Sequence, residues 1–159
     1  MTDLLETPAV SRTGAYVRVI RWGVVALAAS AAIAWYGAYG DPHPKADQEA
    51  AVPAIIAVMA GAIVVLYGAL VAPGLRGAST RPGRWAGIGL ALGILGLVAV
   101  PVASWSGLPV VLGTAAALLG GAARTDRSRS LPGWATGVGV AAIGLSVVML
   151  VLGNTVMSS

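Results

Sequence analysis

The residue types best suited to bind a metal ion gather between two apolar blocks, in residues 40–49. Asp41, His43, Asp47 and Glu49 offer carboxylate oxygens and an imidazole nitrogen within nine residues. Such ligands suit divalent cations, but their spacing matches no established metal motif. The two intervening prolines are typical of a rigid, solvated connection between helices. We therefore assign no metal site and no cofactor, and keep these four residues as the candidate ligands if a cation binds.

The apolar blocks themselves carry no ionisable residue from which to build chemistry. Ionisable groups inside a membrane usually mark ion pathways and proton relays, so ion-coupled transport is disfavoured. Because His43 is the sole histidine and cysteine is absent, paired-histidine haem ligation and thiolate sites are excluded. No Ser/His/Asp set or intramembrane aspartate pair is present either. We expect a protein that is not an enzyme.

A second pattern, of small residues four apart, could position helices against one another. Residues at i, i+4 and i+8 share one helix face, and small ones let two backbones approach closely in lipid. The principal interpretation is that these faces hold the protein's own helices together. The alternative is that the helix containing Gly89 and Gly93, small on two faces, reserves that face for a partner or a second copy. The predicted helix-packing residues are Gly87, Gly89, Gly93, Gly113, Ala117, Gly121, Gly137 and Ala141, and Gly83, Ala91 and Gly133 extend the same rows.

The composition is that of a membrane protein. Hydrophobic residues make up 57% of the chain and charged residues only 10%, against about 25% charged in soluble domains. The apolar residues also come in long blocks rather than amphipathic stripes, which indicates lipid contact. The ten basic residues are scattered between these blocks, so nucleic-acid binding is discarded. We predict a single membrane domain over residues 1–159.

The longest uncharged run, Trp85–Ala123, decides the number of spans. Its 39 residues would make a helix about 58 Å long, whereas the hydrocarbon core of a bilayer is about 30 Å thick. The segment Pro101–Pro109 near its middle contains two prolines, a glycine, two serines and a tryptophan, which together predict a turn. We therefore predict two spans here.

The sequence thus predicts an all-α integral membrane protein with five helices. Pro53 is expected in the first turn of the second helix, where a missing N–H costs nothing. Pro73 and Gly74 are expected to end that helix. The predicted helices are residues 20–39, 50–73, 85–103, 108–123 and 133–155.

The arginines predict the orientation of these helices. With five spans, nine of the ten basic residues fall on one face and Lys45 alone on the other. Basic loops remain cytoplasmic, so the N-terminus is expected inside and the C-terminus outside. If Trp85–Ala123 were one span, the last arginine cluster would lie opposite the others. Tryptophans at the two interfaces agree: Trp22, Trp85 and Trp134 on the inner side, and Trp35 and Trp105 on the outer.

The first helix has a competing interpretation as a signal peptide. A basic start, an apolar stretch and Ala32-Ile33-Ala34 resemble a cleavage signal. Trp35, Tyr36 and Tyr39 instead resemble an interfacial aromatic belt. We favour a retained helix.

Two stretches of the chain resemble each other and suggest a duplicated hairpin. Residues 82–91 (PGRWAGIGLA) align with residues 132–141 (PGWATGVGVA) after two one-residue shifts, and each follows an arginine-rich loop. Helices two and three, and four and five, would then be tandem parallel hairpins after one extra helix. The alternative is that Pro-Gly-Trp-Ala is simply how a glycine-rich helix begins at an interface.

Together these features predict a non-catalytic accessory subunit, assembly factor or scaffold that acts through glycine- and alanine-rich helix faces. Its partners would be the lipid bilayer and another membrane protein or a second copy. The alternative is a transporter or channel component for an apolar or uncharged substrate, working as an oligomer.

The excess of arginine over lysine, with abundant alanine, glycine and valine, indicates a GC-rich genome. The expected location is a bacterial inner membrane, crossed several times.

Overall fold

A computed structural model describes residues 12–39, 46–124 and 130–157, with the side chains of all these except 12, 37, 38, 46–49 and 154–157. Every element within those ranges is helical. Long apolar stretches satisfy their backbone hydrogen bonds internally only as helices, which is the requirement for crossing a bilayer. The elements are α1 (Arg12–Tyr39), α2 (Ala46–Leu66), the π-helical turn η1 (Tyr67–Val71), α3 (Ala72–Gly77), α4 (Pro82–Ala103), the 3-10 turn η2 (Ser104–Ser106), α5 (Leu108–Ala122) and α6 (Ser130–Met157).

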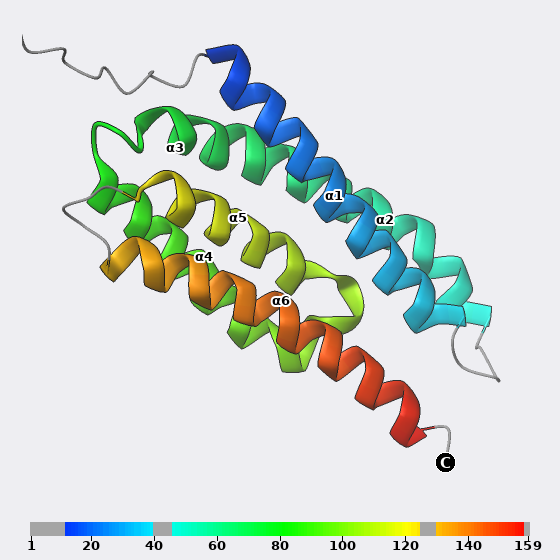
Figure 1. Cartoon of the computed structure of the whole chain (residues 1–159). Helices are drawn as coiled ribbons and strands as arrows, with labels where there is room; N and C mark the ends of the chain where they lie inside the picture. The colour runs from blue at the N-terminus through cyan, green and yellow to red at the C-terminus, as the bar shows by residue number, and fades with distance from the viewer. Residues whose placement is uncertain (1–11, 40–45, 125–129, 158–159) are drawn as a thin grey trace, which may run out of the picture.

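The chain runs back and forth five times, with α2, η1 and α3 forming one pass (Figure 1). Four passes are long and apolar enough to cross a membrane, and α5 is a shorter apolar helix. This confirms an all-α, multi-pass membrane protein of about five helices. The run Trp85–Ala123 divides into α4 and α5, as its length required.

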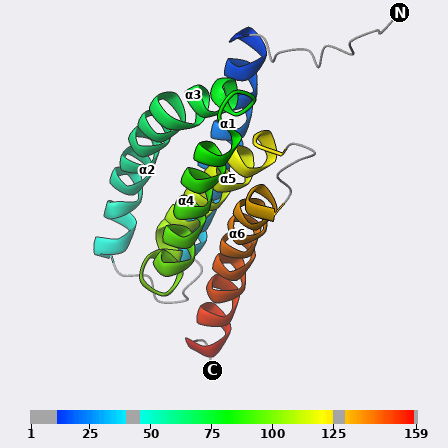
Figure 2. The same ribbon diagram turned by 90° about the vertical axis from the view of Figure 1, so that its left-hand side faces the viewer.

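The three C-terminal helices form the centre of the fold. α4, α5 and α6 pack against one another in all three pairs, while α1 packs chiefly on α2 and reaches the centre through α5. Figure 2 shows α2 on the side of the molecule away from α6. The short helix α5 is enclosed by the others, because α1, α3, η1, α4 and α6 all contact it. Its buried residues, including Val111, Ala115, Ala116 and Leu119, form much of the core.

The turn between α4 and α5 is closed by hydrogen bonds within the protein. The Ser106 hydroxyl donates to the Ala103 carbonyl at 2.7 Å, and the Leu108 amide donates to the Ser106 oxygen at 3.3 Å. Gly107 takes a left-handed conformation with φ of 72°. At 15 residues, α5 is about 22 Å long, shorter than the hydrocarbon core. Internal hydrogen bonding is what a non-helical turn needs if it lies within the apolar layer.

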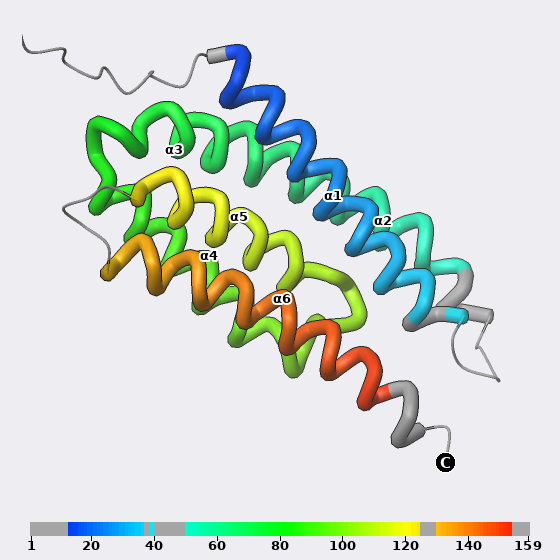
Figure 3. Tube along the Cα trace, viewed as in Figure 1, coloured from blue at the N-terminus to red at the C-terminus, as the bar shows by residue number. Residues whose placement is uncertain are grey.

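The prediction that Pro73 and Gly74 end the second helix is wrong. The helix passes through both residues and ends at Gly77, four residues beyond the predicted end at residue 73 (Figure 3). Proline removes one hydrogen bond and its ring collides with the carbonyl four residues earlier. The preceding π-turn relieves this, since the Ala72 amide donates to the Tyr67 carbonyl five residues back. One widened turn therefore carries the helix through Pro73.

Other predicted boundaries also shift outward. α2 begins at Ala46, which places Pro53 inside the helix rather than in its first turn. Asp47 and Glu49 thereby fall within the first turn of this helix. α1 begins at Arg12 and α6 spans Ser130–Met157, each longer than predicted. Flanking polar residues that the hydropathy pattern excludes can still extend a helix.

The two predicted hairpins differ in how closely their helices pack in the described chain. α5 and α6 pack along each other, whereas the second pass packs mainly on α1 and reaches α4 through α3. The duplication suggested by residues 82–91 and 132–141 stays a prediction. Both stretches do begin a helix of the central three.

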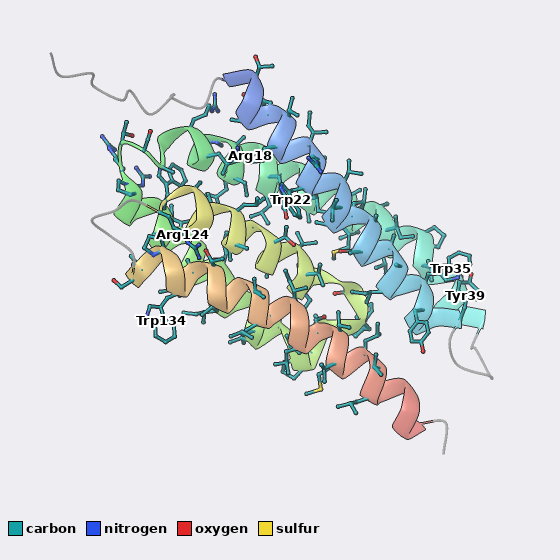
Figure 4. All side chains as sticks on the ribbon, viewed as in Figure 1. Arg18, Trp22, Trp35, Tyr39, Arg124 and Trp134 are labelled. Atoms are coloured by element: carbon teal, nitrogen blue, oxygen red, sulfur yellow. The ribbon has the colours of Figure 1, made fainter. Side chains whose placement is uncertain are left out.

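Arginines mark one end of the helices, and Trp35 and Tyr39 mark the other. Figure 4 shows Arg18 and Arg124 toward one end of the molecule and Trp35 and Tyr39 at the other. Because consecutive passes alternate, the arginines of α3 and α4 share the first end. This arrangement is the one on which the predicted orientation depends.

The orientation predicts the side on which inserted reporters lie. A reporter placed after Ser106 is expected outside, and one placed after Ser79, in the α3–α4 connection, inside. Alkaline phosphatase activity at the first position and green fluorescence at the second would agree with an N-terminus in the cytoplasm. Phosphatase activity at Ser79 would contradict it.

Candidate helix-docking surface

Some of the predicted packing residues lie where helices of this chain meet most closely. A Cβ added at Gly113 would lie 2.6 Å from the carbonyl oxygen of Gly139 and 2.9 Å from Ile143 Cγ1. One added at Gly93 would lie 3.0 Å from Val138 Cγ1. One at Gly89 would lie 3.2 Å from the Ala116 carbonyl. Because real Cβ contacts are rarely this short, these glycines set the spacing of α4, α5 and α6.

Gly96 and Gly139, which face these residues, were not among the predicted packing residues. Gly139 lies against α5, where an added Cβ would be 3.0 Å from the Ala117 amide nitrogen. At Gly120 an added Cβ would lie 2.7 Å from the Thr136 hydroxyl and 2.9 Å from the Pro132 carbonyl oxygen. At Gly96 it would lie 3.3 Å from Ala142 Cβ. The signal in the sequence was that Gly96 follows Gly89, and Gly120 follows Gly113, by seven residues, but spacing alone does not say which face turns inward.

Other predicted packing residues have open space beside them. Beyond the adjacent turns of its own helix, no described heavy atom lies within 4 Å of a Cβ added at Gly87, Gly121 or Gly137. Ala91 and Ala141, one turn beyond Gly87 and Gly137, are both exposed. The small residues therefore fall into two sets, one packed inside the protein and one open on its surface.

This division does not support the alternative that α4 keeps the face with Gly89 and Gly93 for a partner. The face with Gly89 and Gly93, proposed as the spare one, is buried against α5 and α6. The open face is that of Gly83, Gly87 and Ala91. Leucine at Gly89 and Gly93 would therefore disturb folding and would not isolate a partner interaction.

A groove between α4 and α6 carries the open small residues of α6. Its volume is about 440 Å³. Trp134 stands at the end of α6 nearest the arginines and is 68% exposed, and Figure 4 shows its ring directed away from the bundle. Bare glycine backbone in such a groove permits close helix contact and Cα–H···O interactions. The groove is lined by Leu97, Gly133, Trp134, Gly137, Val138 and Ala141, with Ser130 at its edge.

Buried hydroxyl groups tie the first two passes to the centre. The Tyr67 hydroxyl donates to the Val111 carbonyl of α5 at 3.3 Å, and Tyr67 is only 2% exposed. The Ser30 hydroxyl donates to the carbonyl of Ala26 at 2.8 Å and of Gly107 at 3.3 Å. These bonds hold α1 and the π-turn against α5 and leave the hydroxyls engaged with backbone.

The aromatic side chains differ in their surroundings. Trp85, predicted at the lipid interface, is half-buried and packs over Gly74 and Gly77; a Cβ added at Gly77 would lie 2.6 Å from its indole nitrogen. Its outer face carries the Arg84 guanidinium, 5.6 Å from the ring. Trp22 and Trp134 are exposed as a belt requires.

The structure does not describe the side chains of the four candidate metal ligands. Asp41 and His43 lie outside the described residues, and the side chains of Asp47 and Glu49 are not described. Within the part of the chain that the structure describes, no three His, Cys, Asp or Glu residues come together. The arrangement that the described residues do form is a packed interior with an open, small-residue groove. No family model matches this chain, and comparison with curated proteins and solved structures found no match.

Proposed function

We propose that this protein is a non-catalytic membrane subunit that docks a transmembrane helix of a second membrane protein in the α4–α6 groove. The observation that carries the proposal is that Gly137 and Ala141 are exposed in a groove, while other glycines already pack the interior. In lipid, helices associate through close packing of small residues rather than through the hydrophobic effect. A groove lined by small residues, on a bundle whose own helices are already packed, is suited to such contact with a further helix.

The engaged hydroxyls support a binding role over a transport role. Thr114 and Thr136 donate to carbonyls of their own helices, at 2.7 and 3.0 Å, and Tyr67 to α5. Hydroxyls used in this way do not line a polar path across the membrane. The site of action we propose is the plasma membrane of a bacterium, with the arginine-rich end in the cytoplasm.

A leucine at Gly137 tests the docking directly. The side chain has room in the free protein because nothing lies within 4 Å of its Cβ position, but it fills the groove that the partner needs. We expect Gly137→Leu to lose a stoichiometric partner during purification in mild detergent, with thermal stability unchanged. The partner would be identified by mass spectrometry of the parent complex.

Gly153→Leu is the matched control. Gly153 is also open, lies on the same helix and faces about the opposite direction at 100° per residue. It should retain the partner. Equal loss from both variants, or retention by both, would contradict docking in this groove. A clean homo-oligomer from the parent would instead favour the transporter alternative.

A further inference from the structure

A second groove lies between α1 and α2, on elements that the α4–α6 groove does not use. Its volume is about 350 Å³ and its lining is almost wholly apolar. Val19, Gly23, Ile63 and Tyr67 are buried and form its floor. The hollow arises because Gly23 and Gly68 carry no side chains at the contact between the two helices. Gly68 is exposed, with open space at its Cβ position.

One charged residue marks one end of this α1–α2 groove. The Arg76 guanidinium lies 5.1 Å from the ring centre of Tyr16, and Tyr16 lines the groove. The Arg76 Nε donates to the Ala72 carbonyl at 3.3 Å, which fixes the guanidinium at this position. Arg76 is exposed and lies beside Tyr16, so its guanidinium is accessible to a ligand at this end of the groove.

We propose that the α1–α2 groove binds one membrane phospholipid with an anionic headgroup. From Tyr16 to Leu27 the lining of α1 extends eleven residues, about 16 Å along the helix, which accommodates most of an acyl chain. The phosphate then lies at Arg76, whose planar donors suit phosphate oxygens. An apolar trough closed at one end by a cation is complementary to a charged headgroup with its chain.

Arg18 and Arg21 line a different hollow together with Trp22. It lies on the opposite side of α1, has a volume of about 400 Å³ and is more polar than the α1–α2 groove. Arg84 stacks on Trp85, away from the groove. A general attraction of basic loops to anionic lipid would involve all of these residues alike, whereas the proposed site depends on Arg76.

Native mass spectrometry of the purified protein with added phosphatidylglycerol or phosphatidylcholine tests this. The parent is expected to retain one phosphatidylglycerol in preference to phosphatidylcholine. Arg76→Gln should lower phosphatidylglycerol retention about fivefold, from the loss of one headgroup contact, and lower phosphatidylcholine retention less, because the choline cation already offsets the charge of its phosphate. Arg84→Gln, which also removes a cation stacked on an aromatic ring, should change neither.

A leucine at Gly68 tests the chain-binding part separately. Gly68→Leu fills the trough and should lower retention of both lipids, whereas Gly61→Leu, equally open on α2 but outside the groove, should not. Thermal stability of each variant confirms folding. Equal losses for Arg76→Gln and Arg84→Gln would reduce the effect to surface charge. Loss of phosphatidylglycerol only with Arg18→Gln and Arg21→Gln would place the headgroup at those arginines. Equal retention of the two lipids by the parent would mean that only annular lipid is bound. Each of these outcomes overturns the proposal.

Discussion

Replacing Gly113 with leucine is expected to destabilise the protein by about 3 kcal/mol, at the upper end of overpacking effects. The first added carbon already lies 2.6 Å from the backbone oxygen of Gly139. Backbone cannot rotate away as a flexible side chain does, so α5 and α6 must move apart. Thermal unfolding in detergent, followed by a dye that reports exposed apolar surface, measures the loss.

Gly121→Leu is the control for the same helix and the same substitution. Beyond the adjacent turns of α5, the described part of the chain places no heavy atom within 4 Å of its Cβ position, so its unfolding temperature should remain close to that of the parent. If Gly113→Leu and Gly121→Leu unfolded at the same temperature, the close α5–α6 crossing would be refuted.

Replacing Gly107 with alanine is expected to cost about 2–4 kcal/mol, which is large for one methyl group. Two costs combine. An L-residue at φ of 72° pays about 1–2 kcal/mol for the left-handed conformation. The new Cβ would also lie 2.6 Å from Ser30 Cα and 2.8 Å from its hydroxyl oxygen, which pushes α1 away from the α4–α5 turn.

The matched substitution is Gly144→Ala, at a helical position with open space. It should be neutral or slightly stabilising, because alanine favours helix. Unfolding of both variants by thermal melt separates the two cases. A Gly107→Ala protein as stable as Gly144→Ala would show that the turn does not pack on Ser30.

Much of the architecture follows from sequence because lipid leaves few alternatives. The uncharged run Trp85–Ala123 is too long for one pass, and its proline- and glycine-containing centre gives the turn that the structure has at Ser104–Gly107. The arginine positions required the same division independently. Hydrophobicity and charge therefore predict the number of passes and their alternation.

The path through Pro73 could not be predicted in the same way. Proline rules describe an ordinary α-helix, and the π-turn at Tyr67–Val71 changes the hydrogen-bond register just before the proline. That turn depends on tertiary contacts, among them the Tyr67 hydroxyl bond to α5. Sequence periodicity contains no signal for it.

Which face of α4 turns toward the other helices also could not be predicted from the sequence. Gly89 and Gly93 are spaced like Gly83 and Gly87, and both pairs suit close helix contact. Only the placement of α5 and α6 on one side buries the first pair and leaves the second open. Four-residue spacing thus identified residues suited to packing but not which partner each would meet.

Photocrosslinking in native membranes tests the central claim most directly. A photoreactive residue at Ala141, exposed in the α4–α6 groove, is expected to form an adduct with one other membrane protein, and Gly137→Leu in the same chain should abolish it. The same probe at Val58, exposed on α2, should give no such adduct. Equal adducts at both positions, lipid adducts alone at Ala141, or an adduct with the mass of two copies of this chain would contradict the docking of a partner helix.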